Sequence, residues 1–78
     1  MEIKDTKLKK IVAMVKGTNK NRLAYPKLVE HLIRQRYNIS QEFAVQRQRD
    51  TEVAEFNEYN AYCEECKVEA KRMLEIED

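Results

Sequence analysis

The chain has 78 residues, of which 42% are hydrophobic and 37% are charged, and its formal net charge is +1. A chain of this length makes one domain with a small core, and its regularly spaced apolar residues indicate a folded protein and not a disordered one. One glycine and one proline are too few for the tight turns of an all-β domain, and no apolar run reaches the roughly 18–20 residues of a membrane span. We therefore expect residues 1–78 to form a single all-α domain, a small bundle of three or four helices with a long C-terminal helix.

The first helix is predicted over residues 6–16, with Asp5 as the residue that caps its free N–H groups. Gly17 suits the left-handed backbone that commonly follows a last helical turn. The polar residues 18–22 are expected to form a loop. The apolar stripe of this helix repeats at i, i+3, i+4 and i+7 and consists of Leu8, Ile11, Val12 and Val15.

The second helix is expected to begin near Pro26 and to run to about Tyr37, because a proline is tolerated in a first turn whose N–H groups have no intrahelical partner. Arg36 projects toward the apolar side, so its stem is expected to cover the core while its guanidinium reaches water. The buried side of this helix is predicted to consist of Leu28, Val29, Leu32 and Ile33.

A third helix is predicted over residues 41–49, with Ser40 as its N-cap. Phe43 and Val45 alternate with more polar residues, which is a pattern that a short strand also shows. The glutamate, glutamine and arginine content of the segment favours helix, and the strand stays open as the alternative.

The longest helix is predicted over residues 52–75, with Asp50 or Thr51 as its cap. Its glutamates lie largely on the side opposite its apolar residues, which is typical of an amphipathic helix with a solvated back. The apolar arc of about 100° consists of Phe56, Tyr59, Cys63, Cys66, Ala70, Met73 and Leu74.

Cys63 and Cys66 form a lone CxxC motif, for which zinc binding and thiol redox chemistry are the functional interpretations. A zinc site needs about four ligands, so His31 and a carboxylate would have to supply the other two. Redox chemistry needs the first thiol at a helix N-terminus, whereas these cysteines fall in mid-helix on the apolar arc. Packing in the core is the favoured interpretation, and no metal, cofactor or catalytic residue is predicted.

The small net charge hides a strong asymmetry. Residues 1–37 contain ten Lys or Arg against three Asp or Glu, and residues 38–78 contain five against eleven. The basic half has three interpretations: a face that binds phosphates, a surface that balances the acidic helix within the domain, or a site for an acidic partner. The candidate contact residues for a partner or a nucleic acid are Lys7, Lys9, Lys10, Lys16, Lys20, Arg22, Arg47, Arg49 and Tyr62.

The phosphate-binding interpretation has a specific form. The second helix, the break at residues 37–39 and the third helix would make a helix-turn-helix. Gln41, Gln46, Arg47 and Arg49 would then face a DNA groove. Any three helices with a short turn resemble this motif, and the acidic last helix would repel DNA unless it faced away.

Residues 37–71 carry a recognisable pattern. An aromatic-polar segment at 37–40 precedes an Ala-Val-Gln-Arg-Gln-Arg-Asp run at 44–50, then Glu55-Phe56 with Tyr59 and Tyr62, and Cys66-Lys67. This pattern resembles a group of short proteins encoded by phages and prophages of gut bacteria, although Val53 replaces the proline typical of the group. With the preceding residues 28–37, the resemblance covers a little over half of the chain. It implies a viral origin and a small helical protein, and it assigns no catalytic or binding residue.

The sequence thus predicts a non-enzymatic, phage-related helical interaction or assembly module, whose partner is another protein or a second copy of the chain. The alternative is a small nucleic-acid-binding protein that uses the basic N-terminal half. Catalysis is not expected, because no acid–base pair or nucleophile constellation is visible, and neither a small-molecule substrate nor a membrane partner is predicted. The N-terminal residues lack the apolar stretch of a signal peptide, so the expected location is the host-cell cytoplasm or the virion.

Overall fold

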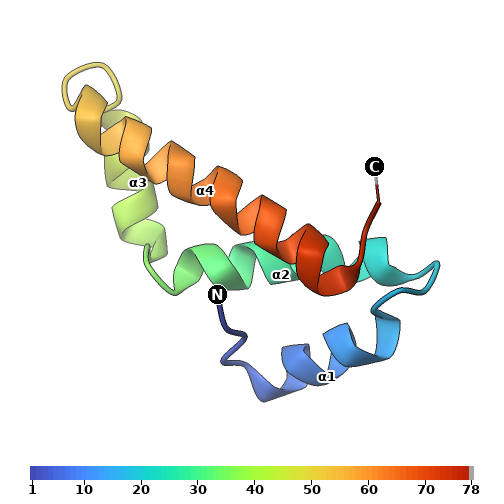
Figure 1. The fold of residues 1–78 in the computed structure, drawn as a ribbon. Helices are drawn as coiled ribbons and strands as arrows, with labels where there is room; N and C mark the ends of the chain where they lie inside the picture. The colour runs from blue at the N-terminus through green and yellow to red at the C-terminus, as the bar shows by residue number, and fades with distance from the viewer. Residues whose placement is uncertain (78) are drawn as a thin grey trace.

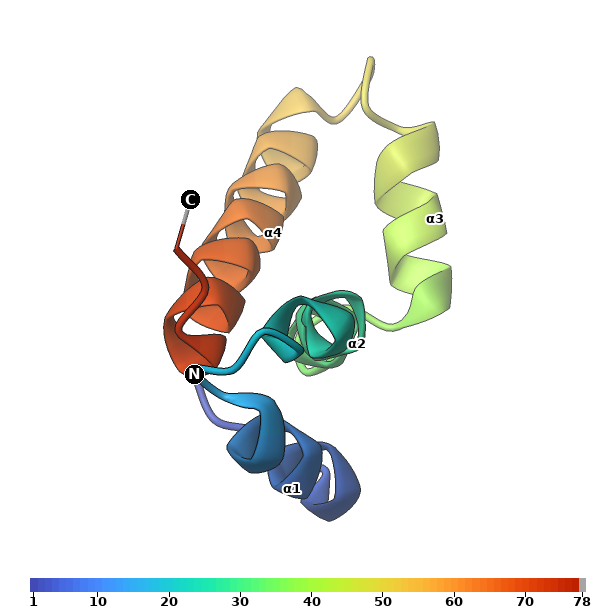
Figure 2. The same ribbon diagram turned by 90° about the vertical axis from the view of Figure 1, so that its right-hand side faces the viewer.

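The computed structural model describes residues 1–77. Within them the chain forms α1 (Thr6–Val15), α2 (Asn21–Arg34), α3 (Ile39–Arg47) and α4 (Val53–Leu74), and no strand is present (Figure 1). The predicted all-α fold with a long C-terminal helix is confirmed, and the third element is a helix and not a strand. α2 lies between α1 on one side and the hairpin of α3 and α4 on the other (Figure 2).

The core lies where α4 packs on α2. The side chains there are long on α2 and mostly short on α4, so the two helices interlock closely. Leu8 and Val12 of α1 cover the core from outside and are exposed by only 7% and 6%. The residues with no exposed surface are Leu28, Leu32, Cys66, Ala70 and Leu74.

The start of α1 and the turn after it agree with the prediction. The Asp5 side chain accepts a hydrogen bond from the Leu8 N–H at 3.1 Å. Gly17 has a φ of +72°, and its N–H donates to the Leu74 carbonyl at 3.1 Å, which ties this turn to the end of α4. Ile11 was expected in the buried stripe, but it is 42% exposed because α1 contacts the core mainly through the neighbouring Leu8 and Val12.

α2 begins five residues before the predicted start at Pro26, and residues 21 and 22 are helical and not part of a loop. The reason is tertiary. The Asn21 amide donates to the carbonyls of Leu74 and Glu75 at 3.1 and 3.3 Å, and Arg22 donates to the Glu77 carbonyl at 2.8 Å. These bonds hold the first turn of α2 against the end of α4, where they offset the helical hydrogen bond that an interior proline removes.

α3 begins at Ile39, before the predicted start at residue 41, and its N-cap is Asn38 and not Ser40. Asn38 and Gln41 form a capping box: the Gln41 N–H donates to the Asn38 side chain and the Asn38 N–H donates to the Gln41 side chain, both at 2.8 Å. The helix ends at Arg47 and buries no residue fully. α3 is therefore held by its cap and by contacts with α4, without apolar anchors of its own.

α4 matches the prediction within one residue at each end, but neither Asp50 nor Thr51 caps it. Glu52 occupies the N-cap position and makes no capping hydrogen bond through its side chain. At the other end Glu75 adopts a left-handed backbone with a φ of 56°. The predicted apolar arc is confirmed, since Tyr59 and Cys63 are buried and the outer members of the arc are partly covered.

We predict that Asn21→Ala lowers the free energy of unfolding by about 1–2 kcal/mol, because two hydrogen bonds to carbonyls at the end of α4 are lost. Asn19→Ala is the matched control, since Asn19 is exposed in the adjacent turn. Urea unfolding followed by circular dichroism measures both changes. Equal effects of the two substitutions would contradict the role assigned to Asn21.

Candidate functional site

The predicted contact residues do not gather on one surface. The six basic residues from Lys7 to Arg22 are exposed on α1, in the following turn and at the start of α2. Arg47 and Arg49 are exposed at the turn between α3 and α4, which lies at the end of the molecule far from α1 (Figures 1 and 2). The basic residues from Lys7 to Arg22 and the pair Arg47 and Arg49 therefore do not form one continuous binding surface.

Tyr62, one of the candidate contact residues, is half-buried and not fully exposed. Its ring packs against the core, and its hydroxyl donates to the Leu32 carbonyl at 2.9 Å. The Arg36 guanidinium lies 5.0 Å from the centroid of the Tyr62 ring and forms an ion pair with Glu58. The Arg36 guanidinium thus lies over the rings of Tyr37 and Tyr62, and its side chain is 45% exposed.

A groove runs between α1 and α2 and encloses about 430 Å³. At one end of the groove the Nε2 atom of His31 already has hydrogen-bond partners. It accepts a hydrogen bond from the Lys4 backbone N–H at 3.1 Å and lies 3.1 Å from the Gln35 amide nitrogen. His31 therefore ties the N-terminal segment to α2. The residues that line the groove are Asp5, Lys7, Leu8, Ile11, Lys27, Glu30, His31 and Arg34.

Exposed apolar side chains continue the groove toward the turn between α1 and α2. Met14 lies one turn after Ile11 on α1, and Leu23 lies one turn before Lys27 on α2, so helical spacing places them on the flanks that line the groove. Met14 is 77% exposed and Leu23 is 78% exposed. Neither residue was among the predicted contact residues, because both lie off the apolar stripes of their helices. An apolar residue off such a stripe is expected to be exposed, and this was the sign in the sequence that could have identified them.

Three lysines around this groove have no acidic partner among the residues that the structure describes. Within residues 1–77, Lys7, Lys10 and Lys27 take part in no ion pair. Lys9 lies on the other flank of α1, where it lines a second shallow groove with Arg72 and other residues. The acidic helix therefore does not balance these three lysines within residues 1–77, although it pairs with Arg36 through Glu58.

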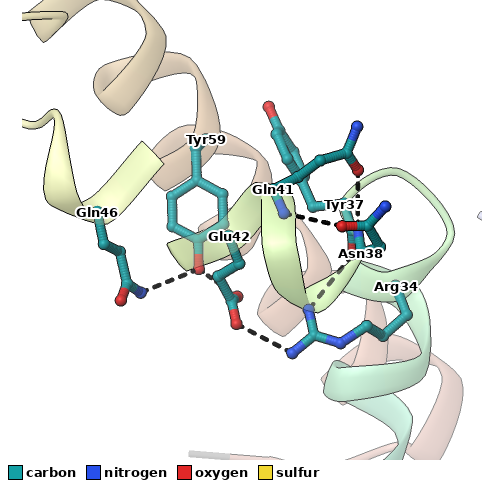
Figure 3. A network of polar contacts seen from close by, with 7 residues as sticks. All are labelled: Arg34, Tyr37, Asn38, Gln41, Glu42, Gln46 and Tyr59. Carbon is teal, nitrogen blue, oxygen red and sulfur yellow. Dashed lines mark hydrogen bonds and ion pairs between the residues drawn. The ribbon is translucent and has the colours of Figure 1, made fainter. Parts of the chain in front are cut away.

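A polar network joins α2, α3 and α4, and the sequence analysis missed it (Figure 3). Arg34 donates to Glu42 at 2.9 Å and to the Tyr37 carbonyl at 3.3 Å. The Tyr59 hydroxyl donates to the other oxygen of the Glu42 carboxylate, and the Gln46 amide lies 3.5 Å from the same hydroxyl. No spacing rule relates these residues, because they come from three separate helices.

The network shifts the protonation of its members. Hydrogen bonds from Arg34 and then from Tyr59 hold the pKa of the Glu42 carboxyl below its ordinary value. Burial, and then the hydrogen bond to Glu42, raise the pKa of Tyr59. Both oxygens of the Glu42 carboxylate are occupied, so the arrangement orients helices and leaves no free base.

Cys63 and Cys66 are free thiols buried in the core, as the favoured interpretation expected. Cys66 has no exposed surface, and burial raises the pKa of its thiol. A raised pKa and lack of access are the opposite of what a reactive thiol needs. The two residues behave here as small apolar side chains.

We predict that Glu42→Gln lowers the free energy of unfolding near neutral pH by about 1–3 kcal/mol, because Arg34 and Tyr59 lose a charged acceptor. Since the Glu42 pKa is lowered on folding, its stabilising effect is complete above its ordinary value of 4.5 and is lost as the pH falls through the folded-state pKa. The variant should therefore lose less stability than the parent between about pH 7 and about pH 3. Urea unfolding at the two pH values measures this.

Glu65→Gln is the control for the acid experiment, because Glu65 is exposed and forms no ion pair within the described residues. It should leave both the stability and its pH dependence close to those of the parent. If Glu42→Gln kept the full acid sensitivity of the parent, the role of the network in stability would be wrong.

We also predict that both cysteines react slowly with a disulfide reagent in the native protein and rapidly in urea, because exposure of the thiols requires unfolding. Absorbance of the released chromophore gives the two rates, and metal analysis of protein purified without chelator accompanies them. Native thiols that reacted at the unfolded rate, or stoichiometric zinc, would overturn the core assignment of Cys63 and Cys66.

Comparison with protein-family models, with curated proteins and with solved structures finds no match. Among residues 1–77 no three or more His, Cys, Asp or Glu side chains are grouped so that they could hold a metal ion. None of the helices in this part of the chain has the length and apolar composition needed to cross a bilayer. Function must therefore be argued from the surfaces and contacts of the chain itself.

Proposed function

We propose that the chain is a non-enzymatic helical interaction or assembly module that contacts another protein through exposed helix faces. The observation that carries this proposal is the exposure of Met14 and Leu23, each by more than three quarters, on helix flanks whose neighbouring turns line a groove between α1 and α2. Single exposed apolar residues are common, but apolar side chains next to a groove are typical of surfaces that a partner covers.

The state of the titratable groups favours this proposal over an enzyme. The Glu42 carboxylate has a partner on each oxygen, and the Nε2 of His31 is occupied by the N-terminal segment. Cys63 and Cys66 are buried, and burial raises the pKa of the Cys66 thiol. General acid–base or nucleophilic chemistry needs a free group beside space for a substrate, and these groups lack that combination.

The contacts of α3 favour a protein partner over a nucleic acid. In the helix-turn-helix alternative, Gln41 and Gln46 would face DNA, but the Gln41 side chain is part of the capping box and the Gln46 amide faces Tyr59. Glu52 and Glu55 are exposed at the start of α4, beside α3. Acidic groups there would repel the phosphates that α3 has to approach.

The viral part of the proposal rests on the resemblance of residues 37–71 to short phage and prophage proteins. A module of this kind would act in the host-cell cytoplasm or in the virion. A phage origin suits the proposed function, since small helical modules can serve in assembly without chemistry of their own.

We predict that the full chain shows no detectable binding to random duplex DNA at micromolar protein and about 50 mM salt, conditions under which electrostatic binding is strong. Fluorescence anisotropy of labelled DNA measures this. A matched variant, Arg47→Ala with Arg49→Ala, should behave in the same way as the parent.

Micromolar binding that fell steeply with salt would contradict the proposal and favour the nucleic-acid alternative. Loss of that binding in the Arg47 and Arg49 variant would then place the DNA at α3, and its retention would place the DNA at the lysines of α1.

A further inference from the structure

We propose that the groove between α1 and α2 is the docking site for an acidic amphipathic helix of a partner protein. This inference rests on the proposed function and specifies its partner. The surface concerned, which we call the α1–α2 face, consists of Lys7, Ile11 and Lys27, which line the groove, and of Lys10, Met14 and Leu23, which helical spacing places next to them.

The geometry of the two helices brings these residues together. α1 and α2 are joined by the short turn at residues 16–20, so the end of α1 lies next to the start of α2 (Figure 1). Met14 and Leu23 therefore lie at the same end of the groove, and Ile11 and Lys27 line it one turn further along. The result is an apolar strip along the groove with lysines on its edges.

The shape of this surface fits a helix. Two helices that pack side by side leave a groove between them, and an amphipathic helix lies in such a groove with apolar anchors at i, i+3, i+4 and i+7. Ile11, Met14 and Leu23 are exposed by 42%, 77% and 78%, so an occupant would remove a large apolar area from water. The open form of the groove suits an extended side-by-side contact better than an enclosed small molecule.

The charge of this surface requires an acidic occupant. Lys7, Lys10 and Lys27 form no ion pair within residues 1–77. Asp5 and Glu30 are the acidic residues that line the groove, and Asp5 is engaged as the cap of α1. Carboxylates on the edges of a docked helix would meet the free lysines, which gives register and rate of association as well as affinity.

A second copy of the chain fits this surface poorly through its own α1–α2 face or through its acidic helix α4. Two α1–α2 faces would place lysines against lysines. The acidic helix α4 exposes Val53 and Val68 as its large apolar side chains, and these lie 15 positions apart instead of one turn apart. α4 of another copy therefore lacks the pair of neighbouring anchors that the groove is suited to receive.

The test is a titration of the isotope-labelled full chain with a stapled helical peptide of about 15 residues, a length that covers α1 at 1.5 Å per residue. The peptide carries leucine at i, i+3, i+4 and i+7 and glutamate on its flanks. Nuclear magnetic resonance should show saturable shifts that are confined to amides of α1 and α2. Binding should weaken at about 300 mM salt, and a peptide with lysine in place of glutamate should not bind.

Matched variants locate the site. Leu23→Glu and Lys27→Glu should each weaken peptide binding, by about tenfold or more for Leu23→Glu because an apolar anchor is lost and a like charge is added. Val68→Glu and Lys9→Glu make the same chemical changes elsewhere on the surface and should bind as the parent does. Circular dichroism shows that each variant keeps its helices, and Met14→Ala is a milder second test of the anchor.

Four results would overturn the inference: no saturable shift up to about 1 mM peptide, shifts that map to α3, equal binding of the lysine peptide, or self-association that Leu23→Glu abolishes. If the acidic peptide fails while duplex DNA is also not bound, the inference is wrong and the proposed function stands. If the chain binds duplex DNA through the α1–α2 face, both are wrong.

Discussion

The contact between α2 and α4 is the interaction on which the rest of the structure depends. Leu28 and Leu32 meet Cys66, Ala70 and Leu74, and water reaches none of the five side chains. A chain of 78 residues buries a modest share of its surface, so a core of this size allows few such contacts. The other two helices are positioned by where they meet this pair: α1 lies across α2, and α3 lies beside the first half of α4.

The two ends of this contact are fixed in different ways. At one end Gly17, Asn21 and Arg22 bind carbonyls at or just beyond the end of α4, which satisfies acceptors that a helix terminus otherwise leaves free. At the other end Arg34 and Tyr59 hold Glu42, so a half-buried carboxylate orients α3, a helix that buries no residue fully. Such a polar contact depends on geometry, and each member would be costly to leave unpaired.

The accuracy of each predicted helix boundary depends on whether local sequence or tertiary contacts fix that boundary. α4 was predicted within one residue at each end, because 22 helical residues repeat an apolar period and average out local ambiguity. The predicted start of α2 was wrong because it relied on Pro26, a local sign of a first turn. The observed start at Asn21 depends on hydrogen bonds to residues more than 50 positions away, which local sequence does not reveal. The start of α3 was wrong because this helix buries nothing fully, so no apolar stripe distinguished Asn38 from Ser40 as its cap.

The candidate surfaces also differ in how far local sequence, as opposed to tertiary contacts, determines them. The basic character of residues 4–22 is plain in the sequence, and the lysines are exposed as expected. Tyr62 was misplaced by its angle on the helix, because a long ring at the edge of an apolar arc reaches back to Leu32. Met14 and Leu23 could not be placed next to one groove before the arrangement of α1 and α2, which run in roughly opposite directions, was known (Figure 1).

The charge asymmetry now has a more definite physical meaning. Several acids of the second half are paired, since Glu42 and Glu58 meet arginines from the end of α2 and its following turn, and Glu64 meets Lys67 within α4. Within residues 1–77 the lysines of α1 and Lys27 of α2 do not share in this balance, and Lys16, which follows α1, makes one long contact with Glu75 at 3.9 Å. Internal pairing therefore accounts for part of the acidic half and for little of the basic half.

The unpaired lysines affect which partner can bind. A solvated lysine without an ion pair costs little folding free energy. When such lysines lie beside exposed apolar side chains, they favour the binding of an acidic helix over a neutral or basic one. A neutral or basic helix would bury the same apolar area and leave the lysines without acceptors, so the unpaired charge acts mainly on specificity.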